Sequence, residues 1–416
     1  MSYIKRAIEN EYLKSANNSK SVAITGARQV GKTTLTKSLF PDVPRINMKS
    51  DYLYNAALED VSSFLKSYSR PLFIDEVQRA PFILNEIKVI LDEVGGVKNY
   101  FFSGSQKWKL MKGLSDSLAG MVSILELNGL SMREINEIDF NKPFLPTNDY
   151  INEREKYLKK YENIWFYIHN GFYPELYENT NRDWKRFYAD YVSTYIERDV
   201  YDIIAIKDAN LFYKFLVSVA ARTAQMLNYA NIADDIGADV GTIKSWISIL
   251  ERTGIIYILQ PYFNSHLSRA IKTPKVYFRD TGLAAYLTNW NTPEQLKDGA
   301  MNGAFFETYV VNEIIKSYSN CGEDYSRFIY YYRGKDKIKV NGEAQEGEID
   351  LIIEQDGTLY PIEIKKNTAV KAEMASIFTI LDKDLDKKRG QGAIICNIDH
   401  KLYLRDNLIA LPIEYI

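Results

Sequence analysis

The pattern with the most chemical content lies near the start of the chain, where residues 26–33 read GARQVGKT. It fits G-x-x-x-x-G-K-[ST], follows the apolar run 21–25 and precedes a helical pattern. Glycines let consecutive backbone N–H groups converge on phosphate oxygens, and the helix behind them points its positive end at the same anion. Because Lys32 at a helix N-terminus is electrostatically misplaced unless an anion faces it, the segment predicts a nucleoside triphosphate site.

Each residue of this motif has an expected role. Lys32 should reach the β- and γ-phosphates, and Thr33 should supply a hydroxyl to Mg²⁺. An accidental glycine turn is the structural alternative. No Asn-Lys-x-Asp sequence for guanine occurs in the chain, so ATP is favoured over GTP. The expected ATP contacts are Gly26, Ala27, Arg28, Gln29, Val30, Gly31, Lys32, Thr33, Thr34, Ser103 and Ser105.

Polar residues also follow two further apolar runs. Asp75 and Glu76 end the run 72–74; Asp75 is expected to hold the Mg²⁺ shell, and Glu76 to polarise the water that attacks the γ-phosphate. The run 100–102 leads into Ser103 and Ser105, either of which is a candidate to sense the γ-phosphate. Helix capping explains the two acids equally well in isolation, and turn chemistry explains the serines.

A second group of chemically capable residues lies near the C-terminus. Asp350 and Glu363 belong to two strand patterns joined by an Asp-Gly turn signal. Alternation by two places Glu363 and Lys365 on one face, with Asp350 on the neighbouring strand. Glu307 falls on the apolar side of a helical pattern over 303–318, where a carboxylate is costly unless it is paired or bound to metal.

The spacing D-x₁₂-E-x-K of these residues resembles the metal-dependent nuclease core of the PD-(D/E)xK type, with Glu307 as the acid from its first helix. In that chemistry Asp350 and Glu363 hold Mg²⁺, and Lys365 stabilises the transition state or positions the attacking water. Basic residues also occupy alternate positions in a strand-like run nearby, a pattern called the cationic alternation below. It predicts either a row of positive charge that follows a nucleic-acid phosphate backbone or an edge strand protected by lysines. It consists of Arg333, Lys335, Lys337 and Lys339.

The elements that must position these groups fall into four units. Strand runs alternating with helical patterns such as 85–94 predict a parallel α/β sheet over 1–135. Residues 136–225 read as a helical segment whose aromatic stripe is core rather than a cofactor box. A helix-turn-helix pattern and the β-like run 255–259 indicate a winged helix over 226–290, and 291–416 form the nuclease-like unit. The stripe is Trp184, Phe187, Tyr188, Tyr191 and Tyr195.

The charge of the winged-helix segment argues against DNA binding. Residues 228–260 contain two basic and four acidic side chains, a net charge of 2 − 4 = −2, which disfavours phosphate contact. Packing or protein contact and DNA contact therefore both stay open. The expected buried face of its second helix is Ile243, Trp246, Ile247 and Leu250.

Composition bounds the remaining possibilities. The 416 residues include 52 Lys and Arg against 54 Asp and Glu, so no global positive field draws the molecule onto nucleic acid. With 46% hydrophobic and 25% charged residues the chain is typical of soluble globular proteins. Two cysteines, Cys321 and Cys396, exclude a disulfide framework and match no zinc-ligand spacing. Since no apolar stretch reaches membrane-spanning length, a cytoplasmic protein without membrane contact is expected.

Taken in order, several motifs resemble a known group. The chain is similar to a prokaryotic AAA-type (AAA+ superfamily) P-loop ATPase with a C-terminal domain of unknown function of restriction-endonuclease-like fold. The resemblance implies a P-loop NTPase parallel sheet of the additional-strand class, a helical segment, a winged helix and a C-terminal α/β domain. The motifs are 26–33, 73–78, Gly104-Ser105, 171–175, 196–199 and 347–365.

The sequence departs from that group at two positions. Met121 stands where the group often has arginine, which leaves Arg133 and Arg198 as candidates for an arginine contact to the γ-phosphate. Asn170 stands where a glycine commonly precedes the motif 171–175.

Two functions are compatible with these patterns. One is an ATPase whose nucleotide state controls a nuclease-like domain that acts on DNA. The other is an ATP-dependent protein-interaction switch whose nuclease-like domain is catalytically silent. A nucleotide kinase is disfavoured because no lid for a second substrate is evident and Glu76 suits water activation. ATP and Mg²⁺ are the expected cofactors, and other copies of the chain are a further candidate partner.

Overall fold

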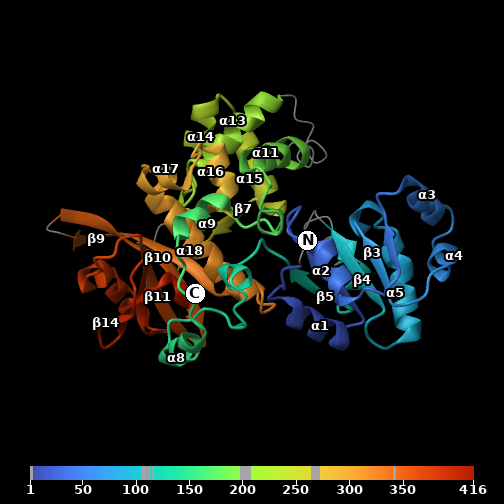
Figure 1. Cartoon of the computed structure of the whole chain (residues 1–416), viewed down its shortest axis with the longest axis horizontal. Helices are drawn as coiled ribbons and strands as arrows, with labels where there is room; N and C mark the ends of the chain where they lie inside the picture. The colour runs from blue at the N-terminus through green and yellow to red at the C-terminus, as the bar shows by residue number, and fades with distance from the viewer. Residues whose placement is uncertain are drawn as a thin grey trace.

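The N-terminal unit is a five-stranded sheet with helices on both faces (Figure 1). The computed structural model describes residues 3–104, 110, 113–114, 117–196, 208–263, 272–340 and 343–416, with the side chains at 195–196, 335–340 and 343–346 left out. All sheet pairs are parallel, in the order β2-β3-β4-β1-β5, which confirms the predicted parallel α/β sheet. Its strands are β1 (Ser21–Thr25), β2 (Arg45–Asn47), β3 (Leu72–Asp75), β4 (Tyr100–Gly104) and β5 (Val122–Glu126).

The helices of this unit follow the apolar patterns that bury them. The predicted helix 85–94 is α5, which begins two residues earlier and buries Ile83, Leu84, Ile87 and Leu91 on one side. The described helices are α1 (Glu9–Asn18), α2 (Lys32–Leu39), α3 (Asp51–Glu59), α4 (Val61–Lys66), the 3₁₀ turn η1 (Val77–Arg79) and α5 (Ile83–Val94).

A helical unit follows, and its aromatic stripe is core as predicted. Phe187, Tyr188 and Tyr191 are buried, Trp184 packs against the same core, and the side chain of Tyr195 lies outside the described residues. The elements are α7 (Met132–Ile135), α8 (Asn148–Arg154), η2 (Glu155–Tyr157), α9 (Ile164–Asn170), α10 (Glu175–Glu178), α11 (Trp184–Tyr191), the π-helix η3 (Val192–Ile196) and α13 (Ala209–Ala220).

Among the described residues, the segment predicted to be a winged helix contains three helices and a small antiparallel sheet, and a fourth helix follows it. Gly237, at φ 71°, ends α14, and Asp239 caps α15 by accepting a hydrogen bond from Thr242 N at 2.9 Å. The predicted inner face of α15 is buried. Its assignment as a winged helix stays a prediction. The elements are β6 (Gln225–Met226), α14 (Tyr229–Ile236), α15 (Val240–Arg252), β7 (Ile256–Leu259), β8 (Lys275–Phe278), α16 (Thr281–Leu287) and α17 (Pro293–Asp298).

The C-terminal unit is a long helix against a mixed sheet in the order β14-β15-β13-β11-β10-β9, with β12 on β11. The predicted hairpin is confirmed: β10 and β11 are antiparallel and turn at Asp356 and Gly357, with φ 51° and 70°. The elements are α18 (Asn302–Ser319), η4 (Tyr325–Arg327), β9 (Ile329–Val340), β10 (Glu343–Gln355), β11 (Thr358–Lys365), η5 (Ala372–Lys383), β12 (Lys388–Arg389), β13 (Gly392–Cys396), β14 (Leu402–Arg405), β15 (Leu408–Pro412) and η6 (Ile413–Tyr415).

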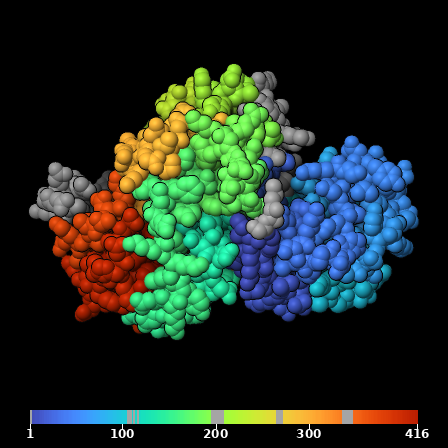
Figure 2. All heavy atoms as spheres, in the orientation of Figure 1, coloured from blue at the N-terminus to red at the C-terminus, as the bar shows by residue number. Residues whose placement is uncertain are grey.

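The units share one core, although the N-terminal unit forms a distinct lobe at the right of the space-filling view (Figure 2). A continuous apolar cluster includes Val22 of β1, Phe172 of the helical unit and Ile362 of β11. Helix α18 lies at the centre of this arrangement, and residues 308–319 are all buried. Motion of one unit is therefore resisted by contacts with the others. No helix in the described parts of the chain is long and apolar enough to cross a membrane.

The motif 171–175 is a packing junction. Gly171 has φ 77° and ψ −167°, a conformation that favours glycine, and a Cβ there would overlap the Tyr188 hydroxyl and lie 2.6 Å from Asp280 Oδ1. Phe172 N donates to Asp280 Oδ2 at 2.6 Å, while Leu130 N donates to Phe172 O at 2.7 Å. The motif therefore fastens the segment after β5 to the start of α16.

We expect Gly171→Ala to lower the free energy of unfolding by about 1–3 kcal/mol more than Gly95→Ala, because only Gly171 would be overpacked. Both glycines follow a helix with similar backbone angles (Gly95: φ 64°, ψ −166°), so backbone strain is matched. Among the described residues nothing lies within 4 Å of a Cβ at Gly95. Urea denaturation measures both losses, and equal losses would contradict the packing role.

Candidate nucleotide site and C-terminal carboxylate cluster

The loop between β1 and α2 has the backbone that its glycines predict. Gly26 and Gly31 have φ 147° and 95°, and a Cβ at Gly26 would overlap the Leu127 carbonyl. Lys32 begins α2 and donates from Nζ to the carbonyls of Gly26 at 2.9 Å and Ala27 at 2.7 Å. Burial lowers the pKa of Lys32 to about 8. An anion in this loop would gain both the α2 N-terminus and the lysine.

The expected magnesium ligands lie at the carboxyl edge of the same sheet. Asp75 ends β3, and its register partners are Asn47 on β2 and Ser103 on β4. Ser103 Oγ donates to Asp75 Oδ1, and Asn47 Nδ2 donates to Asp75 Oδ2 at 3.3 Å. Thr33 is exposed in the first turn of α2. A carboxylate and a hydroxyl are the hard oxygen donors that Mg²⁺ prefers, so these residues fit the ion.

Glu76 is held by a lysine that the motif does not contain. It has φ 52°, receives a hydrogen bond from Gln78 Nε2, and its Oε1 lies 2.7 Å from Lys49 Nζ. Burial would raise the pKa of Glu76, but the bonds from Lys49 and Gln78 and the charge of Lys32 lower it to about 2. Glu76 is thus ionised near neutral pH and turned toward Lys49. The sequence did not single out Lys49 as a partner of Glu76. Lys49 follows β2, a strand of three residues that the apolar pattern does not reveal.

The remaining sequence candidates divide into two groups. Ser105 and Arg198 lie outside the described residues. Arg133 is wrong as a γ-phosphate contact, since it is buried and bonds to the Phe140 and Ile416 carbonyls at 3.2 Å each. Its NH1 also donates to Lys142 O at 2.8 Å and its NH2 to Tyr150 Oη at 2.7 Å, so four hydrogen bonds hold the guanidinium. Its charge serves to hold the C-terminus against the helical unit.

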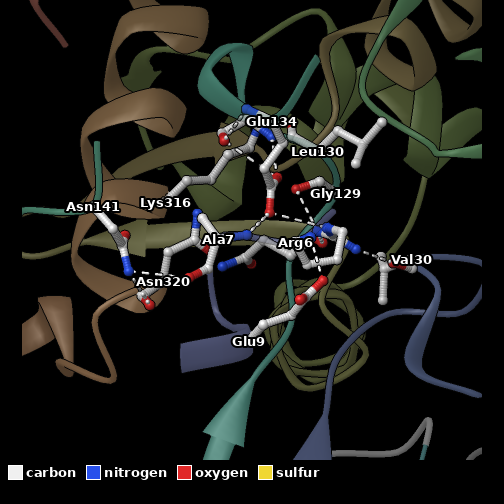
Figure 3. Close-up of polar contacts among 12 residues, drawn as sticks. Arg6, Ala7, Glu9, Val30, Gly129, Leu130, Glu134, Asn141, Lys316 and Asn320 are labelled. Carbon is white, nitrogen blue, oxygen red and sulfur yellow. Dashed lines mark hydrogen bonds and ion pairs between the residues drawn. The ribbon is translucent and has the colours of Figure 1, made fainter. Parts of the chain in front are cut away.

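Arg6, which the sequence did not single out, joins the phosphate loop to α7 (Figure 3). Its guanidinium is 3% exposed and donates to Val30 O and Asn128 O at 2.7 Å each. Arg6 Nε also lies 3.0 Å from Glu134 Oε1 in a buried ion pair. Glu134 completes a capping box with Ser131 at the start of α7.

Helix α18 holds the same turn from the C-terminal side. Lys316 Nζ donates to Leu130 O and to Glu313 Oε1, both at 2.8 Å. Glu313 Oε2 in turn accepts a hydrogen bond from Met132 N at 2.8 Å. Figure 3 draws Lys316 reaching Leu130 beside the Arg6–Glu134 pair. A chain of buried polar contacts therefore runs from Val30 to α18.

We expect Arg6→Met to lower the free energy of unfolding by about 3–5 kcal/mol, because Glu134 is left as a buried unpaired charge. Arg6→Met/Glu134→Leu should recover part of this loss. The control is Lys142→Met. Lys142 pairs with Glu153, and the two side chains are 54% and 41% exposed, so losing this pair should lower the free energy of unfolding by at most about 1 kcal/mol. Denaturant titration measures all three, and similar losses for Arg6→Met and Lys142→Met would contradict the role of Arg6.

The structure brings the four predicted C-terminal residues into one cluster. Ile364 N donates to Asp350 Oδ2 at 2.7 Å, and Lys365 forms an ion pair with Glu363. Burial raises the pKa of Glu363 well above its usual range, with added repulsion from Asp350. Burial likewise raises the pKa of Glu307 to about 7, with Lys275 opposing and Asp350 assisting. Each of these two carboxyl groups is thus affected by the charge of Asp350, and their role as a catalytic site stays a prediction.

Lys275, Tyr277 and Glu348, which the sequence did not single out, complete this cluster together with Arg333 of the cationic alternation. Lys275 Nζ lies 3.0 Å from Glu307 Oε1 and also pairs with Glu348, and Tyr277 Oη donates to Glu307 Oε1 at 2.7 Å. Arg333 pairs with Glu348 at 3.2 Å. Among the residues that the structure describes, no set of three or more His, Cys, Asp and Glu side chains is placed to hold a metal ion. Metal ligation by Asp350 and Glu363 stays a prediction, and the side chains of Lys335, Lys337 and Lys339 lie outside the described residues.

A cavity of about 860 Å³ opens beside this cluster. It lies between α14 and α15 on one side and β8, β9 and β10 on the other. Lys244 and Asn228 line it from the helices, while Lys275, Arg333 and Glu348 line it from the strands. The cavity gives solvent and small solutes access to the edge of the carboxylate cluster.

Comparison with known proteins identifies the class of the N-terminal unit. Residues 18–136 match a family model described as an AAA domain, and this match, with the parallel sheet and phosphate loop, supports an AAA-type P-loop ATPase. Residues 161–294 and 302–416 match models described as domains of unknown function, DUF8612 and DUF4143.

Two mycobacterial proteins are similar along most of the chain. The uncharacterized proteins Rv2008c of Mycobacterium tuberculosis and Mb2031c of Mycobacterium bovis are each 24% identical over 396 residues, which covers 95% of this chain and 80% of theirs. Solved structures with partial similarity include the Walker-type ATPase PABY2304 of Pyrococcus abyssi (TM-score 0.40, 12% identity, 67% of this chain and 94% of that one). Another is the RuvB Holliday junction branch migration motor of Thermotoga maritima (TM-score 0.28, 15% identity, 61% and 89%).

Proposed function

We propose that this chain binds and hydrolyses ATP and passes its nucleotide state to its C-terminal unit. The observation that carries the proposal is the grouping of Lys32, Asp75 and Glu76 around one glycine-rich loop at the carboxyl edge of a parallel sheet. This edge is where open α/β sheets bind ligands.

The residues divide the chemistry among them. Backbone N–H groups of the loop and Lys32 bind the phosphates, Thr33 and Asp75 would hold Mg²⁺, and the ion would neutralise charge on the β- and γ-phosphates. Glu76 would orient the attacking water and accept its proton. Because Glu76 is paired with Lys49, the pair must loosen before the carboxylate turns to the water. Lys49 therefore restrains hydrolysis until ATP has bound.

Transmission to the rest of the chain relies on Arg6. A γ-phosphate that pulls on the loop displaces the Val30 carbonyl, which accepts from Arg6 at 2.7 Å. Arg6 is also paired with Glu134 in α7, and the turn at the start of α7 is bonded to α18 through Glu313. Buried hydrogen-bonded groups of this kind shift as a unit, because each would be costly to leave without a partner.

The test is ATP binding by calorimetry together with phosphate release. We expect Lys32→Ala to weaken ATP–Mg²⁺ binding at least about tenfold and Glu76→Gln to bind normally but hydrolyse about 10²–10⁴-fold more slowly. Lys49→Met should raise the basal rate roughly two- to fivefold, the factor that an ion pair of up to about 1 kcal/mol allows. The exposed Lys37 on α2 provides the control, Lys37→Met, with an unchanged rate. Unchanged binding in Lys32→Ala would refute the proposal.

A nuclease activity of the C-terminal unit is the second candidate. The convergence of Glu307, Asp350 and Glu363 beside Lys365 supports it, and the negative charge of the segment 228–260 favours instead a silent interaction module. DNA incubated with protein, Mg²⁺ or Mn²⁺, and with or without ATP distinguishes the two. Cleavage that Asp350→Ala abolishes supports the nuclease, with Asp399→Ala as the control, since Asp399 is 78% exposed in the same unit. No cleavage with either metal favours the silent module.

A further inference from the structure

We propose that Gln78 is a positioning residue for the carboxylate of Glu76, and that Gly104 leaves the space that the Gln78 amide needs to reach it. The inference rests on the proposed ATP hydrolysis and adds how the water-activating carboxylate is kept in place once its pair with Lys49 has opened. Its test compares variants of a chain that hydrolyses ATP, so the inference can fail while the proposed function stands.

The two carboxylate oxygens of Glu76 have different partners. Oε1 lies 2.7 Å from Lys49 Nζ, and Oε2 accepts a hydrogen bond from Gln78 Nε2. The side chain of Lys49 is 45% exposed and follows the edge strand β2, so its flexible stem can move away into solvent. Gln78 is half-buried and belongs to η1, the turn that begins directly after Glu76. When the pair with Lys49 opens, Gln78 can therefore keep its bond to Oε2.

Hydrogen bonding determines which way the Gln78 amide points. An ionised carboxylate only accepts hydrogen bonds, so the NH₂ end of the amide has to face Glu76. The carbonyl end then faces Gly104, where Oε1 is buried and accepts no hydrogen bond from the described residues. The direction of the amide therefore depends on its bond to Glu76 and on the space beside Oε1.

Gly104 provides that space. It ends β4 and lies opposite Thr25, the residue before the phosphate loop. A Cβ at Gly104 would lie 2.5 Å from Gln78 Oε1 and 3.2 Å from Leu110 Cδ2. The φ angle of Gly104 is not positive, so crowding rather than backbone conformation favours glycine here. Because the closest atom ends a flexible side chain, an alanine would turn the Gln78 amide away from Glu76 at a small cost in stability.

The test measures phosphate release from ATP together with ATP–Mg²⁺ binding by calorimetry. Gln78→Met keeps the length of the side chain but removes the donor, whereas Gly104→Ala keeps the donor but displaces it. We expect each to lower kcat roughly 10- to 100-fold with an unchanged Kd for ATP, because a catalytic group displaced by about 1 Å can lose that much. The matched controls, exposed Gln295→Met and Gly303→Ala, should leave kcat unchanged, since nothing described lies within 4 Å of a Cβ at Gly303.

Double variants distinguish positioning of Glu76 from a general structural fault. In Glu76→Gln neither substitution should slow hydrolysis further, because no carboxylate is left to position. Gln78→Ala/Gly104→Ala should hydrolyse ATP as fast as Gln78→Ala alone, because the shortened side chain removes the clash. The inference is overturned if Gln78→Met or Gly104→Ala keeps or exceeds the normal kcat, or if either slows Glu76→Gln further. If the unmodified chain releases no phosphate from ATP, the proposed function fails and the inference fails with it.

Discussion

The buried guanidinium of Arg6 is the contact on which the arrangement of the units depends. It lies where the phosphate loop, the segment after β5 and helix α7 meet, and it satisfies the carbonyls of Val30 and Asn128 and the carboxylate of Glu134. A charge that is buried so completely is tolerated only when every donor has a partner. The loop, the segment and the helix are therefore constrained to keep their relative positions as long as Arg6 stays between them.

Helix α18 extends this constraint to the C-terminal unit. Lys316 and Glu313 hold the turn before α7 from one side, and the same helix carries Glu307 into the carboxylate cluster near its N-terminal end. Glu307 and Glu313 are six residues apart on one rigid helix, so a shift of the helix that α7 imposes also moves Glu307. A buried helix transmits such a shift because its neighbours are close-packed and cannot absorb it.

The sequence alone predicted those parts of the fold and of the site whose residues are close together in the chain. The phosphate loop is a contiguous motif, α5 and the inner face of α15 follow the helical period, and the hairpin β10–β11 is marked by alternation and by its Asp-Gly turn. Strand β2 has three residues, of which Ile46 alone is apolar, so the apolar pattern does not reveal it. Arg6, Lys49 and Lys275 were missed for a different reason. Their partners Glu134, Glu76 and Glu307 are distant in sequence, and an isolated basic residue predicts a solvated surface.

Strand β8 gives the two sites a second physical connection. It begins at Lys275, within the carboxylate cluster, and the residue directly after its end, Arg279, pairs with Glu126 at the end of β5 and donates to Asn128 Oδ1 at 3.3 Å. Asn128 is the residue whose carbonyl binds Arg6, so both ends of this short strand are tied to a site. An extended strand is nearly inextensible along its length, and displacing Arg279 therefore displaces Lys275. Under the proposed function, a shift at Asn128 on ATP binding therefore reaches Lys275 and its partner Glu307 without any contact between the nucleotide and the C-terminal unit.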